Sequence, residues 1–194
     1  MSKIVVTTML SIDGYPEGAG GDLSVMPMDQ AFSAFNVERV RAAGHLLFGA
    51  TGYRNMLEYW PAKIHDPDAT PDDRYIASRY ADGIPITVVS DSLDRGDVSA
   101  FDDQTTIVRR ADAHVALREL RENPDPGDVL LFGGRTLWTD LLEHGLVDEL
   151  HLMIGGRVVG GDHRAFEGLS GIDLALLGVR TWADSDSVVL RYAP

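Results

Sequence analysis

The chain has 194 residues, of which 44% are hydrophobic and 24% charged, and it contains no cysteine. This length and composition predict one globular domain over residues 1–194, and the lack of cysteine excludes disulfides, thiol catalysis and cysteine-ligated zinc. A net charge of −13 argues against a nucleic-acid partner, and the sequence shows neither a signal peptide nor an apolar run that could span a membrane, so we expect a cytoplasmic protein.

The first half of the chain is predicted to alternate strands with helices. Residues 3–10 are apolar and β-branched, which is typical of a buried strand, and residues 11–28 form a loop rich in Gly, Pro and Asp. Asp29 is a suitable cap for a helix that runs to residue 43 and ends at Gly44. The segments that follow are a strand at 45–48, a helix at 51–59 stopped by Pro61, a surface loop at 62–72 and a helix at 73–81.

The second half continues the alternation and closes with a hairpin. We predict strands at 85–89, 105–108, 128–132 and 146–154, helices at 112–122 and 135–144, a turn at 124–127 and a terminal hairpin formed by 174–182 and 188–192. This order predicts an α/β fold with a central mixed, mostly parallel sheet, helices on both faces and an antiparallel C-terminal hairpin.

The break at Gly133-Gly134 is the strongest functional signal. A buried strand stops at two glycines directly before a helix, so the backbone can approach a ligand and the helix N-terminus can face an anion. Arg135 and Thr136 add further donors. A tight turn without a ligand explains this segment equally well when it is taken alone.

Two other strand ends carry weaker signals. Asp13, in Ser11-Ile12-Asp13-Gly14, could orient a substrate or handle a proton, although an Asp-Gly turn with no ligand is the simpler explanation. The junction from Gly49 to Gly52 could hold another phosphate at a helix start, or it could be an ordinary helix capped by Thr51.

Other chemistries find little support in the sequence. The six histidines show no His-Glu-x-x-His spacing, so no metal site is predicted. The serines lack the Gly-x-Ser-x-Gly context of a hydrolase.

The order of these segments resembles the dihydrofolate reductase-like superfamily, and within it the C-terminal reductase domain of riboflavin-biosynthesis deaminase-reductases. The matching segments are Ser11-x-Asp13-Gly14, Leu46-Leu47-Phe48-Gly49 with Tyr53 and Met56, Val88-Val89-Ser90, Phe132-Gly133-Gly134 with Leu137, and the run from Gly145 to Leu150. The resemblance covers nearly the whole chain and implies a three-layer fold.

It also implies a reductase that transfers a hydride from NADPH or NADH to a small heterocyclic or carbonyl-type substrate. The pyrophosphate would be cradled by Gly133, Gly134, Arg135, Thr136 and Leu137. The adenosine end would be lined by Gly49, Ala50, Thr51, Gly52 and Ser90. Asp13 would face the nicotinamide and the substrate as the candidate catalytic residue.

The sequence departs from the family pattern where the 2′-phosphate of NADPH would bind. The family commonly has Arg and Thr where this chain has Ala50 and Gly52, and often a basic residue where it has Asp91. Two hypotheses follow: the protein accepts NADH, or it binds nucleotides or other small molecules without efficient catalysis. A homodimer is kept as a further expectation.

Overall fold

The computed structural model describes residues 1–122 and 127–194. Within them, eight strands form one sheet in the order β4-β3-β2-β5-β1-β6-β8-β7. The strands are β1 (Ile4–Ser11), β2 (Ala43–Gly49), β3 (Ile86–Val89), β4 (Thr105–Val108), β5 (Asp128–Phe132), β6 (Glu149–Gly155), β7 (Ala175–Thr181) and β8 (Val188–Ala193). The strands from β4 to β6 in this order are parallel, whereas β8 pairs antiparallel with both β6 and β7.

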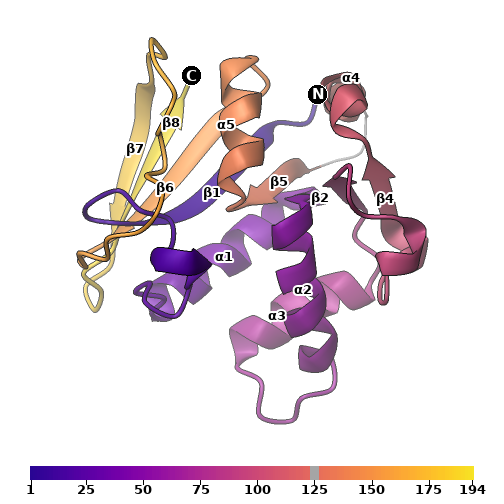
Figure 1. Cartoon of the computed structure of the whole chain (residues 1–194). Coiled ribbons are helices and arrows are strands. Elements are labelled where there is room, and N and C mark those ends of the chain that lie inside the picture. The colour runs from indigo at the N-terminus through magenta and orange to yellow at the C-terminus, as the bar shows by residue number, and fades with distance from the viewer. Residues whose placement is uncertain (123–126) are drawn as a thin grey trace.

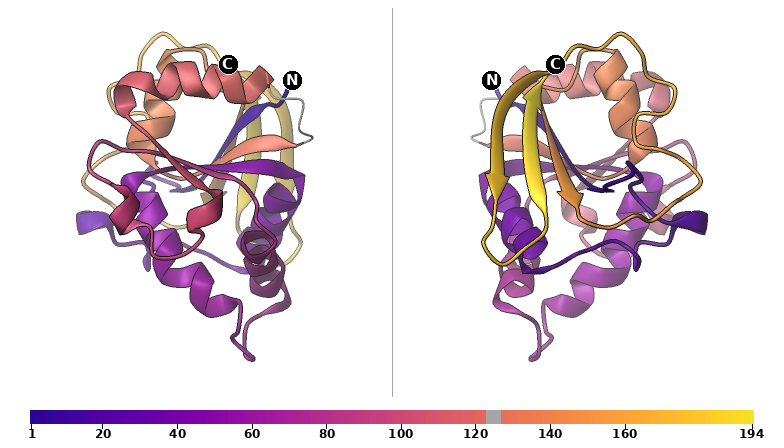
Figure 2. Two further views of the ribbon diagram at one scale, coloured as in Figure 1. Left: turned by 90° about the vertical axis from the view of Figure 1, so that its right-hand side faces the viewer. Right: turned by 90° about the vertical axis from the view of Figure 1, so that its left-hand side faces the viewer.

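Helices cover both faces of the sheet. Figure 1 shows α1 (Gln30–Ala42), α2 (Ala50–Lys63) and α3 (Pro71–Ala81) on one face, and α4 (Ala113–Glu122) and α5 (Arg135–Glu143) on the other. The antiparallel pair β7–β8 closes one side of the sheet (Figure 2). The predicted mixed, mostly parallel sheet with a C-terminal hairpin is therefore confirmed. None of the helices in the described residues is both long and apolar enough to cross a membrane.

The start of α1 was predicted correctly, but its end was not. The Asp29 side chain accepts the Phe32 amide and caps the helix as expected. Gly44 does not end the helix: Ala43 is already extended, and β2 begins there without an intervening turn. The chain packs closely beside Gly44: a Cβ on Gly127, which has a φ of 126°, would lie 2.4 Å from the Gly44 nitrogen, so position 127 requires glycine.

Pro61 does not stop α2, contrary to the prediction. The helix starts at Ala50, one residue before the predicted start at Thr51, and continues through Pro61 to Lys63. Proline removes one backbone donor near the end of a helix, and the Trp60 ring, stacked on Tyr80 of α3 at 5.8 Å, packs this last turn against the protein. Tertiary packing thus outweighs the local preference.

Two further element starts differ from the prediction. The helix α3 begins at Pro71 rather than Asp73, because Thr70 accepts the Asp73 amide and caps it. The strand β6 begins at Glu149 rather than Leu146, because the Leu146 amide donates to the Leu141 carbonyl and completes the turn after α5. The predicted turn at 124–127 lies outside the described residues except for Gly127.

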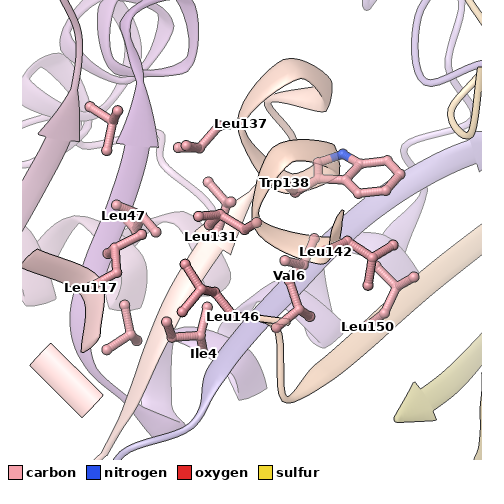
Figure 3. Close-up of a cluster of buried hydrophobic side chains, with 14 of the residues drawn as sticks. Ile4, Val6, Leu47, Leu117, Leu131, Leu137, Trp138, Leu142, Leu146 and Leu150 are labelled. Atoms are coloured by element: carbon pink, nitrogen blue, oxygen red, sulfur yellow. The ribbon is translucent and has the colours of Figure 1, made fainter. Parts of the chain in front are cut away.

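The core beneath α5 positions the strand ends that matter for function. Figure 3 shows Leu137, Trp138 and Leu142 of α5 against side chains of the central strands, including Val6 and Leu131. Trp138 is fully buried. This packing fixes α5, and with it the glycine turn that precedes it, against β5 and β1.

Strand β7 is the most exposed strand of the sheet. Leu176, Leu177 and Val179 are 56%, 46% and 58% exposed. No structural observation tests the expected homodimer, which stays a prediction.

Candidate functional site

The predicted site segments lie side by side at the carboxyl ends of the central parallel strands, which we call the carboxyl edge of the sheet. Parallel strands end on the same side, so Ser90 after β3, Gly49 at the end of β2, Gly133 after β5 and Ser11 at the end of β1 follow one another across neighbouring strands. At a spacing of about 4.8 Å between strands, the segment from β3 to β1 spans roughly 14 Å. The carboxyl edge of a parallel sheet is where ligands bind in open α/β folds.

The Gly133-Gly134 turn has the backbone geometry that glycine requires. Both residues have positive φ, at 56° and 68°, and Gly134 is the cap of α5 with no side chain bonded to the helix start. A Cβ on Gly133 would meet no atom within 4 Å. The first amides of a helix have no partner within the helix, so the N-terminus of α5 is available to an anion.

The start of α2 has similar features. Gly49 caps the helix without a side-chain hydrogen bond, and a Cβ placed on it would lie 3.9 Å from Cβ of Leu137. The N-termini of α2 and α5, which lie on opposite faces of the sheet (Figure 1), therefore approach the same place. Tyr53, part of the same sequence motif, has a structural role: it is buried, and its hydroxyl donates to Thr105 Oγ1 at 3.3 Å.

Around this edge the predicted site residues differ in accessibility. Thr51, Gly134 and Thr136 are exposed, whereas Ala50, Gly52 and Arg135 are half-buried. Leu137 is buried in the core, and its amide donates to the Gly134 carbonyl. Leu137 thus supports the turn by packing.

The Ser90 side chain is turned into its own loop. Its hydroxyl is buried and accepts the amides of Ser92 and Leu93, both at 3.1 Å. The next residue, Asp91, accepts the Arg110 amide at 3.0 Å, and its carboxylate lies 3.8 Å from the Arg110 guanidinium. The Asp91 carboxylate and the Arg110 guanidinium therefore lie next to each other at the end of the predicted site where the adenosine would bind.

Arg109, the neighbouring arginine, is held by the same loop. Its guanidinium donates to the carbonyl oxygens of Ser90 and Leu93 and pairs with Asp94 at 2.7 Å. These three contacts use three of the five N–H donors of the guanidinium within the protein.

Asp13 joins two loops at the end of β1. Its carboxylate accepts the amides of Val159 and Gly160 at 3.1 and 3.0 Å, across 146 residues of sequence. The Ser11 hydroxyl and these two amides lower the pKa of the Asp13 carboxyl to about 2. A group with this pKa stays ionised at neutral pH, which disfavours the proton-handling role that the sequence suggested.

A cavity of about 510 Å³ opens beside Asp13. Its other lining residues come from the turn after β1 and from the long loop after β6; they include Tyr15, Arg164 and Phe166. The Phe166 ring packs on Trp138 at 5.4 Å, which ties the cavity wall to α5. This volume falls within the range of small-molecule sites.

At the opposite end of the strands, where β1 and β6 begin, lies an ion-pair network that the sequence did not reveal. Asp148 accepts the Ile4 amide at 2.8 Å, and Glu149 forms an ion pair with Lys3 at 2.6 Å and accepts a hydrogen bond from buried His151 at 2.8 Å. Burial would raise the pKa of Glu149, but the bonds from Lys3 and His151 outweigh it and hold that pKa at about 2. The Asp-Glu pair of the family motif thus anchors β1 to the start of β6.

We expect this network to make folding sensitive to acid. Because the folded pKa of Glu149 lies below its usual 4.5, the stabilisation is fully present above about pH 4.5 and is lost as the pH falls towards 2. Glu149→Gln should lower the free energy of unfolding by roughly 3 kcal/mol at pH 6. Denaturant unfolding at several pH values should show this difference shrinking towards zero near pH 2.

The control for this prediction is Glu119→Gln, which removes an exposed carboxylate of α4. It should follow the wild-type curve at every pH. A constant difference between Glu149→Gln and wild type across the pH range would contradict the assignment.

Comparison with known proteins agrees with this architecture. The sequence model of one protein family, the RibD C-terminal domain, matches residues 2–190 of this chain. The chain therefore belongs to the RibD C-terminal domain family. Its relatives include the Bacillus subtilis (strain 168) protein YyaP, which is 24% identical over 93% of this chain and 89% of its own length.

Solved structures extend the family assignment to the fold. A Shewanella sp. PV-4 structure described as a riboflavin biosynthesis protein superposes with a TM-score of 0.68 at 19% identity, covering 100% of this chain and 98% of the other. The dihydrofolate reductase of Enterococcus faecalis, solved with NADP(H), superposes with a TM-score of 0.59 at 11% identity, covering 98% and 95%. The chain thus has the dihydrofolate reductase-like fold that the sequence predicted.

Proposed function

We propose that this member of the RibD C-terminal domain family is an NAD(P)H-dependent reductase of a small heterocyclic or carbonyl-type substrate. The observation that carries the proposal is the pair of uncapped helix N-termini, of α2 and α5, at one edge of the sheet with a glycine turn beside them. The pyrophosphate of a dinucleotide would lie there, the adenosine towards β3 and the nicotinamide towards β1. The family assignment and the reductase fold support the same function.

The residues present fit such a cofactor. The open space beside Gly133 leaves room for phosphate oxygens, and the helix amides supply donors of the right charge. The nicotinamide itself supplies the hydride when bound. The protein would position it beside the cavity that Asp13, Tyr15 and Arg164 line, where the small-molecule substrate would bind.

Direct titration of the protein with NADPH and NADH tests the proposal. We expect both to bind with dissociation constants below 1 mM, a threshold equivalent to about 4 kcal/mol of binding free energy, measured by nicotinamide fluorescence or calorimetry. Lack of binding by either dinucleotide at millimolar concentration would overturn the reductase assignment. A screen of heterocyclic and carbonyl compounds for NAD(P)H oxidation would then identify the substrate class.

We expect Asp91 to set the preference between the two dinucleotides. Its carboxylate repels a 2′-phosphate and engages Arg110, so NADH should bind at least as tightly as NADPH. Asp91→Asn frees Arg110 and should raise the affinity for NADPH relative to NADH by roughly 2- to 5-fold, since exposed charge pairs contribute up to about 1 kcal/mol.

Asp94→Asn is a matched control for this variant. Asp94 carries the same charge in the same loop and pairs with the neighbouring Arg109 at 2.7 Å, but that guanidinium also donates to the Ser90 and Leu93 carbonyls and stays held by them when Asp94 is changed. It should leave the ratio of the two affinities unchanged. If both variants shift the ratio equally, the effect comes from net charge and not from Asp91.

A second candidate function is small-molecule binding without turnover, and Asp13 favours it. The carboxylate at the end of β1 is engaged by two backbone amides, so it serves loop geometry. Dinucleotide binding without oxidation of NADPH by any compound in the screen would support this function. In a reductase, Asp13→Asn should leave the pH profile of turnover unchanged.

A further inference from the structure

A cluster of three potential metal ligands lies between α4 and α5, on the face of the sheet away from α1–α3. Asp140 and His144 are four residues apart at the C-terminal end of α5, and His114 reaches them from α4. His114 Nε2 lies 2.7 Å from Asp140 Oδ2, and His144 Nδ1 lies 3.4 Å from Asp140 Oδ1. One ligand atom from each residue falls within 4.8 Å of the other two.

These separations are close to those of a transition-metal site. With metal–ligand bonds of about 2.0–2.1 Å in a tetrahedron, neighbouring ligand atoms lie about 3.3 Å apart. The two histidines approach different oxygens of the Asp140 carboxylate: the contact from His144 Nδ1 to Oδ1 already has this length, and the contact from His114 Nε2 to Oδ2 needs to open by about half an ångström. His144 Nδ1 also lies 2.8 Å from the Asp140 carbonyl oxygen, a hydrogen bond that metal binding would replace. Two imidazoles and one carboxylate suit zinc and similar divalent ions, and not calcium or magnesium, which prefer oxygen ligands alone.

The cluster is reachable from solvent. The side chains of His114, Asp140 and His144 are 28%, 45% and 48% exposed. The two histidine rings lie 4.2 Å apart between centroids, and each has a nitrogen within 3.4 Å of an Asp140 carboxylate oxygen. An ion could enter without a change of fold.

We propose that His114, Asp140 and His144 bind one Zn²⁺ ion per chain, with the fourth position open to water. The ion would join α4 to α5, because the ligands come from both helices. Asp140 lies six residues after Gly134, or about 9 Å along the helix axis. The proposed metal site is therefore distinct from the glycine turn and does not depend on the proposed reductase function.

Calorimetric titration with ZnCl₂ of the full chain, first freed of metal by a chelator, tests this site. We expect one Zn²⁺ per chain with a micromolar or tighter dissociation constant. Zinc at 100 times that constant should raise the thermal midpoint by roughly 5–10 °C. Each of His114→Ala and His144→Ala should weaken binding at least 100-fold, and melting in the presence of chelator shows whether these variants remain folded.

His163→Ala is the matched control. His163 is exposed and sits four residues before Glu167, its partner at 3.1 Å, so it offers a similar pair without a third ligand. Unchanged zinc affinity in this variant supports the three-residue site. The proposal is overturned if zinc binds only above about 100 μM, far weaker than structural zinc sites, or if His163→Ala weakens binding as much as His144→Ala.

Discussion

Thr136→Asp is expected to weaken the binding of NADPH and NADH roughly 30- to 150-fold while leaving the protein folded. Thr136 is exposed in the first turn of α5, directly after the Gly133-Gly134 turn. A carboxylate there would lie close to the pyrophosphate. Two unit charges 4 Å apart near a protein surface interact by about 4 kcal/mol, which salt and solvent reduce to roughly 2–3 kcal/mol.

The same substitution should not destabilise the helix. A negative charge in the first turn interacts favourably with the helix dipole, by about 0.3–1 kcal/mol. The thermal midpoint should therefore stay the same or rise slightly. Substituting Gly134 is a less direct test, because its positive φ strains any residue with a side chain.

Two variants serve as controls for this experiment. Thr136→Asn has a similar shape without the charge and should bind both dinucleotides nearly as well as wild type. Thr181→Asp adds the same charge at an exposed position on β7 and should have no effect on binding. Full retention of binding by Thr136→Asp would place the pyrophosphate elsewhere.

Trp138→Ala is expected to cause the largest loss of stability. The side chain is fully buried in the core under α5, where it contacts Phe166. Truncating a buried tryptophan to alanine costs about 3–5 kcal/mol. For a chain of this length the thermal midpoint should fall by roughly 6–20 °C.

Trp138→Phe separates ring packing from the polar indole group. Among the described residues, the Trp138 N–H is buried without a hydrogen-bond partner, so its removal breaks no bond. Phenylalanine keeps most of the volume and should cost about 1 kcal/mol. Leu177→Ala, at a position 46% exposed, should change stability by less than about 0.5 kcal/mol.

Local sequence patterns predicted most elements of the fold. The apolar runs at β1 and β5, the Asp29 cap and the terminal hairpin were predicted nearly to their final bounds, because strand periodicity and capping act within a few residues. The predicted boundaries at Gly44, Pro61 and Leu146 were wrong. At Pro61 the packing of Trp60 against Tyr80 outweighs the local preference. At Leu146 the turn after α5 delays the start of the strand, and before Gly44 the backbone is already extended at Ala43.

The sequence by itself determined that several strands end in glycine or a small polar turn, and that the Gly133-Gly134 turn precedes a helix. Only the tertiary structure decided the order of the strands, which brings Gly49, Ser90 and Gly133 to one edge. It also decided that Asp13 binds amides 146 residues away, and that His114 meets Asp140. Partners so distant along the chain leave no local pattern, because their meeting depends on how the whole sheet assembles.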